Sequence, residues 1–311
     1  MEMGMVGLGR MGGNMVLRLL KRGHKLVAFD QSPDAVKAHV AQGATGASTL
    51  EDFVKAFKTK PRVMWIMVPA GDPTTQTINK LVELGEPGDI IIDGGNTNWK
   101  LALQDAARVK AKGMHYMDAG TSGGIWGLEY GYCLMVGAEQ EIYDHCLPLL
   151  KDLAPDDGGL VRAGPEGSGH FVKMVHNGVE YGLMQAYAEG FQVMKMSKSF
   201  PGMNMQAIAE AWRTGSVVRS WLLDLIARGL SQDPELSGIK GWVEDTGEGR
   251  WTVEAAIDES VPVPIIAESL FARFRSRMEN TFGDRLLAMM RNQFGGHAVV
   301  SDAKAEAAVK H

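Results

Sequence analysis

Residues 3–12 read MGMVGLGRMG, and this stretch decides the fold of the first half of the chain. An apolar run at 3–8 leads into Gly7, Gly9 and Gly12, which have the spacing GxGxxG. At a strand–turn–helix junction, the first glycine permits the tight turn, the second lets a pyrophosphate approach the backbone, and the third allows close packing of helix on strand. The stretch therefore predicts a Rossmann-type dinucleotide site. A glycine turn without a ligand is the alternative.

Asp30 bears on the choice of cofactor, because it ends the next predicted strand, 25–29. A carboxylate at this place accepts hydrogen bonds from the adenosine ribose hydroxyls and repels a 2′-phosphate. The neighbours Gln31 and Ser32 offer no cation for that phosphate. NAD is predicted as the cofactor, with NADP possible. The alternative is that Asp30 only caps the helix that starts at Pro33.

Short apolar runs alternate with amphipathic stretches up to about residue 162. Strands are predicted at 3–8, 25–29, 63–68, 90–92, 115–117, 133–136 and 160–162, and helices at 12–21, 33–42, 50–58, 73–84 and 99–112. This alternation is typical of a parallel sheet with flanking helices, in which ligands bind at the carboxyl ends of the strands. The later chain is predicted to be helical, with one long helix at 167–196 and another at 265–278. We therefore expect an α/β Rossmann-type, doubly wound N-terminal domain over residues 1–164 and an all-α C-terminal domain over 165–311.

Composition excludes several classes of protein. The net charge of −5 argues against a nucleic-acid binder, which usually carries a basic face. Neither a secretory signal nor an apolar run of about 18 residues is present, so no membrane span and a cytoplasmic location are expected. Cys133 and Cys146 are predicted to be buried free thiols. No metal is expected, because metal-ligand spacing is absent from the scattered histidines, which are His24, His39, His115, His145 and His170.

The segment 167–181, GSGHFVKMVHNGVEY, contains the strongest catalytic candidates. On a helix, Lys173, His176, Asn177 and Glu180 fall at i, i+3, i+4 and i+7 and therefore share one face. A solvated face is the alternative. The other positions are mainly apolar or small, which predicts a buried helix whose polar groups need a ligand as partner. Apolar positions at helical spacing predict a buried stripe: Phe171, Val175, Leu183 and Val193.

The same segment, continued to Gly182, resembles the signature of the decarboxylating 6-phosphogluconate dehydrogenases. Further stretches resemble that family in the same order: GLGRMG at 7–12, MVPAG at 67–71, DGGNTNW at 93–99, TSGG at 121–124, GEGRWT at 247–252, LFARFRSR at 270–277 and RNQFGGH at 291–297. The wider β-hydroxyacid dehydrogenase group shares the glycine turn and the SGG loop. It lacks the HNGVEYG run, and so ranks second.

The resemblance implies oxidation of 6-phosphogluconate at C3 by NAD(P), followed by loss of CO₂ to give ribulose 5-phosphate in the pentose phosphate pathway and gluconate utilisation. It assigns Lys173 as the base for the C3 hydroxyl and Glu180 as the acid that protonates C1. A lysine base must have a depressed pKa. The implied substrate-binding residues are Asn96, Ser122, Gly123, Gly124, His176, Asn177, Tyr181, Arg273, Arg291 and His297. The implied cofactor-binding residues are Gly7, Leu8, Gly9, Arg10, Met11, Gly12, Asp30, Val68, Pro69, Ala70 and Asn96.

Two departures from the long members of this family follow. This chain has room for one copy of the helical region, where long members carry two, so it resembles the short bacterial form. We therefore expect a homodimer or a dimer of dimers, in which a second subunit supplies the missing surface and the helical domain serves both substrate binding and dimerisation. Thr246 stands where long members carry a phosphate-binding lysine, and Arg250 or Lys240 are candidates to replace it. For Arg275 and Arg277, solvation or ion pairing is predicted.

Two other functions remain open. One is a β-hydroxyacid dehydrogenase that acts on a small 3-hydroxy acid, and the other is a non-catalytic dinucleotide-binding module. The presence of both Lys173 and Glu180 speaks against the module, because a non-enzyme has no need of the pair.

Overall fold

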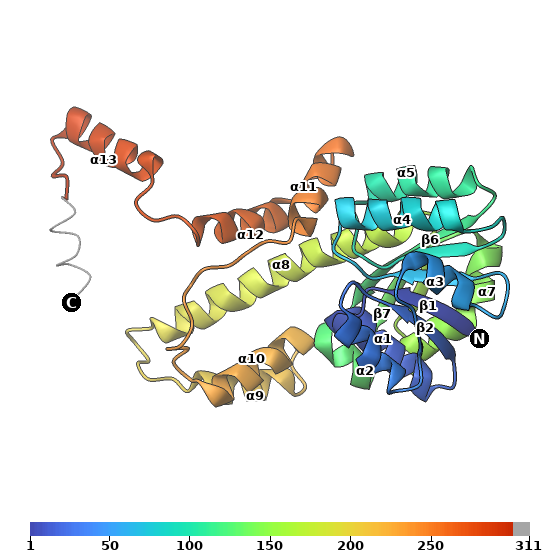
Figure 1. Cartoon of the computed structure of the whole chain (residues 1–311). Coiled ribbons are helices and arrows are strands. Elements are labelled where there is room, and N and C mark those ends of the chain that lie inside the picture. The colour runs from blue at the N-terminus through green and yellow to red at the C-terminus, as the bar shows by residue number, and fades with distance from the viewer. Residues whose placement is uncertain (301–311) are drawn as a thin grey trace. The chain divides into compact units, whose positions relative to one another are not determined.

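The computed structural model describes residues 1–300. The chain divides into two compact units, each of which appears in Figure 1. The first unit comprises Met1–Glu180 and Gly247–Pro262, and the second comprises Tyr181–Thr246 and the chain from Val263 on. This division falls within one long helix, whereas the predicted domain boundary lies at 164. That boundary stays a prediction.

A single sheet forms the centre of the first unit. Its strands are β1 Glu2–Val6, β2 Lys25–Phe29, β3 Thr45–Gly46, β4 Val63–Ile66, β5 Ile90–Asp93, β6 His115–Ser122, β7 Cys133–Gly137 and β8 Leu160–Gly164. The strand order is β3-β2-β1-β4-β5-β6-β7-β8. This order reverses direction between β1 and β4, which is where doubly wound sheets bind their ligand. The predicted α/β Rossmann-type fold is confirmed.

One part of the sheet differs from the expected all-parallel arrangement. β6 and β7 pair antiparallel, with Asp118 opposite Gly137. Only short segments, η1 Gly124–Trp126 and α6 Gly127–Tyr130, connect the two strands. A parallel partner requires a crossover of a dozen or more residues, so the short connection reverses the chain direction.

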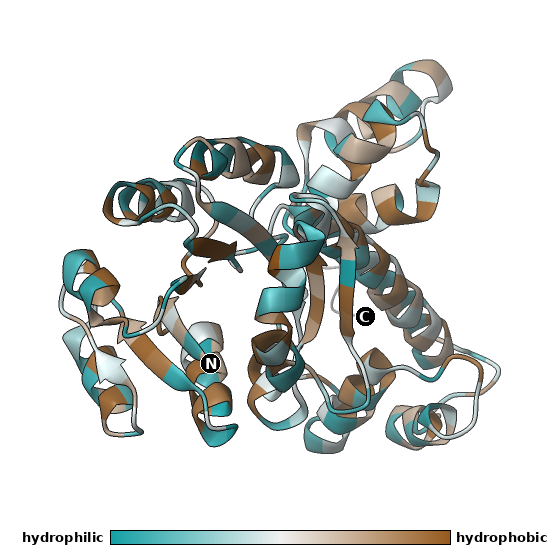
Figure 2. Cartoon of the chain, turned by 90° about the vertical axis from the view of Figure 1, so that its right-hand side faces the viewer, coloured by the Kyte–Doolittle hydropathy of each residue, from teal (hydrophilic) through white to brown (hydrophobic). Residues whose placement is uncertain are grey.

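Helices cover both faces of the sheet. In this unit they are α1 Arg10–Lys21, α2 Pro33–Val40, α3 Leu50–Ala56, α4 Asp72–Leu84, α5 Trp99–Lys110, α7 Gln140–Leu153 and α11 Glu248–Asp258, together with the first part of α8 Ser168–Lys195. Alternate residues of one strand enter different cores: Ile90 and Ile92 pack on one face, and Ile91 packs on the other. Figure 2 shows the brown, hydrophobic strands between helices that also carry teal, hydrophilic residues. The apolar runs are therefore continuous because both faces of the sheet are buried.

The second unit is helical, as predicted. It contains the rest of α8 with α9 Met205–Arg213, α10 Trp221–Gln232, α12 Pro264–Arg275 and α13 Phe282–Gly295. A small core joins α9 and α10, where Ala209, Leu223 and Ala227 are fully buried. None of the residues of α13 is buried.

Two predictions about burial are wrong. Leu183 and Val193, expected in a buried stripe, are 46% and 73% exposed. They lie on the later part of α8, where only one side of the helix meets the α9–α10 core. Cys133, expected to be buried, is exposed because it begins β7, whereas Cys146 on α7 is buried.

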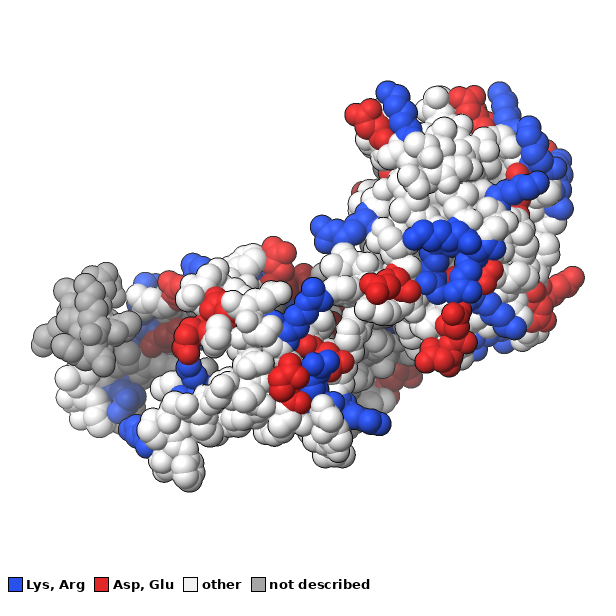
Figure 3. Space-filling model, turned by 90° about the horizontal axis from the view of Figure 1, so that it is seen from below, with Lys and Arg blue, Asp and Glu red and all other residues white. Residues whose placement is uncertain are grey.

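No helix among the described residues is long and apolar enough to cross a membrane. On the face that Figure 3 shows, Lys and Arg side chains lie among Asp and Glu rather than forming a continuous basic surface.

Candidate active site

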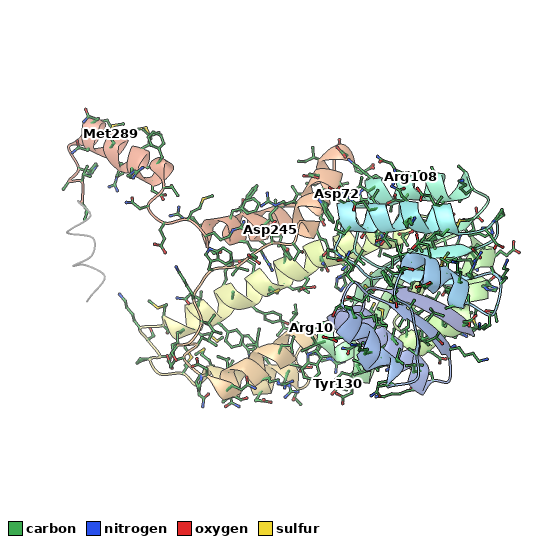
Figure 4. All side chains as sticks on the ribbon, in the orientation of Figure 1. Arg10, Asp72, Arg108, Tyr130, Asp245 and Met289 are labelled. Carbon is green, nitrogen blue, oxygen red and sulfur yellow. The ribbon has the colours of Figure 1, made fainter. Side chains whose placement is uncertain are left out.

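The glycine turn has the geometry that a pyrophosphate needs. Gly7 has φ +96°, and a Cβ there would lie 2.3 Å from the Met67 carbonyl oxygen. A Cβ on Gly12 would lie 2.1 Å from the Gly7 carbonyl oxygen, whereas a Cβ on Gly9 would meet nothing within 4 Å. Gly7 and Gly12 thus allow the close packing of strand and helix, and Gly9 leaves the approach to the backbone open. α1 begins at Arg10, labelled in Figure 4, without a side-chain cap, so its first N–H groups are available to an anion.

A cavity of about 650 Å³ lies beside this turn. Gly7, Gly9, Asp30, Val68 and Pro69 line it, and all five are among the predicted cofactor-binding residues. Further wall residues are Phe29, Gln31, Leu50, Met67, Pro73, Gln76 and Thr77. Such a volume, with apolar walls and a few polar groups, suits a small-molecule or cofactor site.

Asp30 is fixed at the wall of this cavity. Its Oδ2 accepts the backbone N–H of Leu8 at 2.7 Å, and its Oδ1 accepts that of Ser32 at 2.8 Å. It is not the N-cap of α2, because Ser32 occupies that position and its hydroxyl accepts the N–H of Ala35. The alternative that Asp30 only caps this helix is therefore wrong. Each carboxylate oxygen keeps a lone pair for a further donor.

The start of α8 is held closely against the sheet. A Cβ on Gly120 of β6 would lie 2.4 Å from Cβ of Lys173, and one on Gly169 would lie 2.5 Å from the Met135 carbonyl oxygen. Asp118 Oδ1 accepts the N–H of Gly167 at 2.6 Å, and its Oδ2 accepts that of His170 at 2.7 Å. Asp118 therefore caps the first turn of α8 and fixes the helix that carries Lys173.

A buried ion pair lies beside this cap. Nε2 of His170 lies 3.3 Å from Oδ2 of Asp93, and both side chains are fully buried. Asp93 also accepts the Tyr116 hydroxyl at 3.1 Å and the N–H of Gly95 at 2.9 Å. Burial lowers the pKa of His170, but the charge and contact of Asp93 together with the charges of Asp118 and Glu248 outweigh burial, and the net shift is upward. Burial raises the pKa of Asp93, but His170 together with the hydrogen bonds from Gly95 and Thr97 outweighs burial, and the net shift is downward. Both shifts favour an imidazolium beside a carboxylate.

The predicted polar face of α8 is confirmed as a connected group. Lys173 Nζ donates to Oδ1 of Asn177, and His176 Nδ1 contacts the same oxygen at 2.9 Å. His176 Nδ1 also lies 4.0 Å from Oε2 of Glu180. Lys173 is 5% exposed, and burial lowers its pKa against the opposing charges of Glu248 and Glu180. The direction of this pKa shift is the one that a lysine base requires.

The two loops at the carboxyl ends of β5 and β6 also meet. Asn96 has φ +54°, and its Oδ1 accepts the N–H of Thr121 at 3.4 Å. Ser122 ends β6, and Gly123 and Gly124 follow with φ +128° and +54°. Both glycines take the left-handed conformation that turns the TSGG loop.

The second unit brings together Tyr181 and Arg273, two of the predicted substrate-binding residues. The guanidinium of Arg273 lies over the Tyr181 ring, 3.5 Å from its centroid, and its Nη1 donates to the Glu244 carbonyl at 2.9 Å. The Tyr181 hydroxyl accepts the N–H of Thr246 at 3.3 Å. Arg291 and His297, on and after α13, are exposed.

Ion pairing of the next two arginines along the chain is confirmed. Arg275 pairs with Asp284 at 2.8 Å, and Arg277 pairs with Asp245 at 2.9 Å. Figure 4 labels Asp245. Lys240, a candidate for the missing phosphate-binding lysine, is exposed, and so is Arg250. No group of three or more His, Cys, Asp or Glu side chains within residues 1–300 is arranged to hold a metal ion.

Sequence reasoning missed two carboxylates of the first unit. Asp118 belongs to none of the sequence motifs, and it contacts Gly167 and His170, which lie 49 and 52 positions further along the chain. Glu248 belongs to the GEGRWT motif, yet the sequence singles out only its arginine. In the structure Glu248 accepts a hydrogen bond from Nδ2 of Asn177, 71 positions away. An acidic residue inside a family motif was the available signal.

Comparisons with known proteins agree with this geometry. Residues 2–161 match the model of the NAD binding domain of 6-phosphogluconate dehydrogenase, and residues 169–308 match that of the 6-phosphogluconate dehydrogenase C-terminal domain. An NAD(+)-dependent, decarboxylating 6-phosphogluconate dehydrogenase of Haloferax volcanii is 41% identical over 96% of this chain and 98% of its own length.

Longer relatives match over part of their length. An NAD(+)-dependent, decarboxylating 6-phosphogluconate dehydrogenase of Bacillus subtilis is 35% identical over 89% of this chain and 62% of its own. The solved Plasmodium falciparum 6-phosphogluconate dehydrogenase, described with NADP+ and with 6-phosphogluconate, superposes with a TM-score of 0.82 at 27% identity, over 97% of this chain and 66% of that one. Because both family models and a relative of similar length match nearly end to end, the chain belongs to the 6-phosphogluconate dehydrogenase family.

Proposed function

We propose that this chain catalyses the oxidative decarboxylation of 6-phosphogluconate to ribulose 5-phosphate and CO₂ with reduction of NAD. The observation that carries the proposal is the buried Lys173, whose pKa burial depresses, bonded to Asn177 on the face that also holds Glu180. A neutral amine is a base that can take a proton from a hydroxyl. The carboxyl group of Glu180, two helical turns along the same face, supplies the acid that the second half-reaction needs.

The proposed steps follow from the chemistry of the substrate. Lys173 accepts the proton of the C3 hydroxyl, and NAD, when bound, accepts the hydride from C3. The product is a β-keto acid. Lys173 then returns its proton to the C3 oxygen, so that the electron pair of the breaking C1–C2 bond forms an enediol as CO₂ leaves. Glu180 protonates the former C2 of this enediol, which becomes C1 of ribulose 5-phosphate, and Lys173 takes back the hydroxyl proton from the former C3 oxygen, so that the C2 ketone of the product forms.

We propose that the remaining predicted residues bind the two ends of the substrate. His176, Asn177 and Asn96 surround the reacting carbon, and Ser122, Gly123 and Gly124 hold the carboxylate end. At the other end a phosphate dianion calls for cationic forks. Arg273, held over the Tyr181 ring, is such a fork in this chain, and Arg291 and His297 complete the set.

The proposed preference for NAD over NADP rests on Asp30. Its carboxylate lies at the wall of the cavity beside the glycine turn and accepts hydrogen bonds from the backbone N–H groups of Leu8 and Ser32. A 2′-phosphate beside this charge is repelled, whereas a ribose hydroxyl is a suitable donor.

We also propose that the enzyme is a cytoplasmic homodimer or dimer of dimers. Phe282, Leu287 and Phe294 on α13 are 72%, 59% and 80% exposed, and Met289, labelled in Figure 4, is 44% exposed. An exposed apolar helix of this kind marks a surface for a partner. A second copy of the chain supplies such a surface, and Arg291, on the same helix, would then enter the site of the partner.

One assay tests the proposed function directly. Purified protein is mixed with NAD and 6-phosphogluconate, or with small 3-hydroxy acids, and NADH is recorded. We expect NADH to form with 6-phosphogluconate and not with the small 3-hydroxy acids. NADH with the small acids alone would assign the chain to the β-hydroxyacid dehydrogenases. No NADH with any substrate, while NAD binds, would indicate a non-catalytic dinucleotide-binding module.

A further inference from the structure

Glu248 is a buried carboxylate to which the proposed mechanism gives no role. It begins α11 and is 6% exposed. α11 is held against α8 by the Thr252 hydroxyl, which donates to the Met174 carbonyl at 2.8 Å. A Cβ on Gly178 would lie 2.7 Å from Cγ2 of Thr252. This close packing places the first turn of α11 beside the polar face of α8.

The Asn177 amide lies between two different partners. Its Oδ1 end receives Lys173 Nζ and contacts His176 Nδ1 at 2.9 Å, and its Nδ2 end donates to Oε2 of Glu248. A carboxylate accepts hydrogen bonds, so Glu248 selects the amino end of the amide. The carbonyl end is thereby fixed toward Lys173. Rotated by 180°, the amide would present N–H groups to the lysine instead.

This orientation matters for a lysine that acts as a base. A neutral amine has two N–H groups and one lone pair. When one N–H donates to Oδ1 of Asn177, rotation about the last bond of the side chain is restrained and the lone pair takes a fixed direction. With Oδ1 turned away, the lone pair itself would be engaged by an amide N–H of Asn177.

Charge provides a second link between Glu248 and the lysine. The groups that face Lys173 are Glu248 from α11, Glu180 from α8 itself and the Cys133 thiol from β7. A carboxylate nearby favours the protonated amine, whereas burial favours the neutral amine. The protonation of Lys173 is thus a balance in which Glu248 opposes burial.

We propose that Glu248 is a positioning residue for the dehydrogenase reaction: it orients the Asn177 amide so that the carbonyl end faces Lys173, and its charge favours the protonated form of Lys173. This inference rests on the proposed function. It assigns Glu248 no contact with the substrate.

Three variants test the proposal. Glu248→Ala removes both the acceptor and the charge, and Glu248→Gln keeps an acceptor oxygen for Asn177 while removing the charge. The matched control is Asp258→Asn on the same helix, where the aspartate pairs with Lys100 and is 55% exposed at the side chain. Each variant is assayed for NADH formation from 6-phosphogluconate between pH 5 and 9, with thermal unfolding and NAD binding as checks of folding.

We expect Glu248→Ala to lower kcat/KM about ten-fold or more, since a buried amide loses its partner, and Glu248→Gln to stay within about three-fold of wild type. In Glu248→Gln the acidic limb of the pH profile should move to lower pH, because the lysine loses its proton more easily without the neighbouring charge. Asp258→Asn should match wild type in both respects.

Two results would overturn the proposal: wild-type kcat/KM in Glu248→Ala, or a pH profile of Glu248→Gln that superimposes on that of wild type. If Glu248→Ala does not fold, the pH profile of Glu248→Gln decides. Absence of NADH formation from 6-phosphogluconate with the wild-type protein would instead reject the proposed function itself.

Discussion

Replacing His170 with asparagine should destabilise the first unit, because Asp93 then loses its cationic partner. Both side chains of this pair are fully buried, 3.3 Å apart. Breaking a buried ion pair by removing one partner costs about 3 to 5 kcal/mol. Asp93 keeps the Tyr116 hydroxyl and the N–H of Gly95, which places the expected cost at the lower end of this range. The melting temperature should fall by about 6 °C or more.

The stability that His170→Asn loses should depend on pH. The pKa of His170 is raised in the folded protein, so its stabilisation is fully present below the usual histidine value and is lost as pH rises through the folded value. The pKa of Asp93 is lowered, so its stabilisation is present above the usual aspartate value and is lost as pH falls through the folded value. The difference between wild type and variant should therefore be largest at mildly acidic pH and should shrink toward alkaline pH.

Urea unfolding followed by tryptophan fluorescence from pH 5 to 9 measures this difference. The matched control is His145→Asn, the same change at an exposed position on α7, which should alter the free energy of unfolding by about 0.5 kcal/mol or less. A His170→Asn variant as stable as the control, or one whose deficit grows toward alkaline pH, would refute the assignment of a charged pair.

Three further predictions concern the site. Lys173→Met should lower kcat by at least about 100-fold with NAD binding retained, and Glu180→Gln should impair tritium exchange at C1 of ribulose 5-phosphate. Near-normal turnover in either variant would show that the roles are misassigned. Asp30→Ala should reduce the ratio of kcat/KM for NAD to kcat/KM for NADP about five-fold or more, because a like charge at contact distance is worth about 1 to 4 kcal/mol. Equal kcat/KM for the two cofactors in wild type would contradict the premise that Asp30 repels the 2′-phosphate. Inactive Lys173→Met and Arg291→Ala dimers, refolded together, should regain about a quarter of wild-type activity. About half the dimers are then mixed, and each mixed dimer has one intact site out of two. No recovery despite proven heterodimers would place Arg291 in the site of its own subunit.

The sheet could be predicted from sequence almost strand by strand. Six of its strands lie close to their predicted ranges, because buried parallel strands give continuous apolar runs between turn residues. β6 begins where it was predicted but runs to Ser122, beyond the predicted end at 117. β3, with two exposed residues, gives no such run. The antiparallel direction of β7 could not be predicted, since hydropathy does not record direction.

The polar face of α8 could also be predicted from local sequence, because the period of an α-helix places Lys173 and Asn177 on the same face. The groups that hold this face were not. Asp118 and Glu248 reach α8 from other elements, and no local period connects residues 49 or 71 positions apart. The exposure of Leu183 and Val193 could not be predicted either, because apolar residues at helical spacing do not indicate whether the surface that covers them belongs to the same chain.

The central claim, that Lys173 is the base of a decarboxylating dehydrogenase, is tested most directly with 6-phosphogluconate labelled with ¹³C at C1. Labelled CO₂ and NADH are measured in the same reaction for the wild-type protein and for Lys173→Met. We expect one labelled CO₂ for each NADH with wild type, and neither product with the variant although it still binds NAD. NADH without labelled CO₂ in wild type, or both products at the wild-type rate in Lys173→Met, would contradict the central claim.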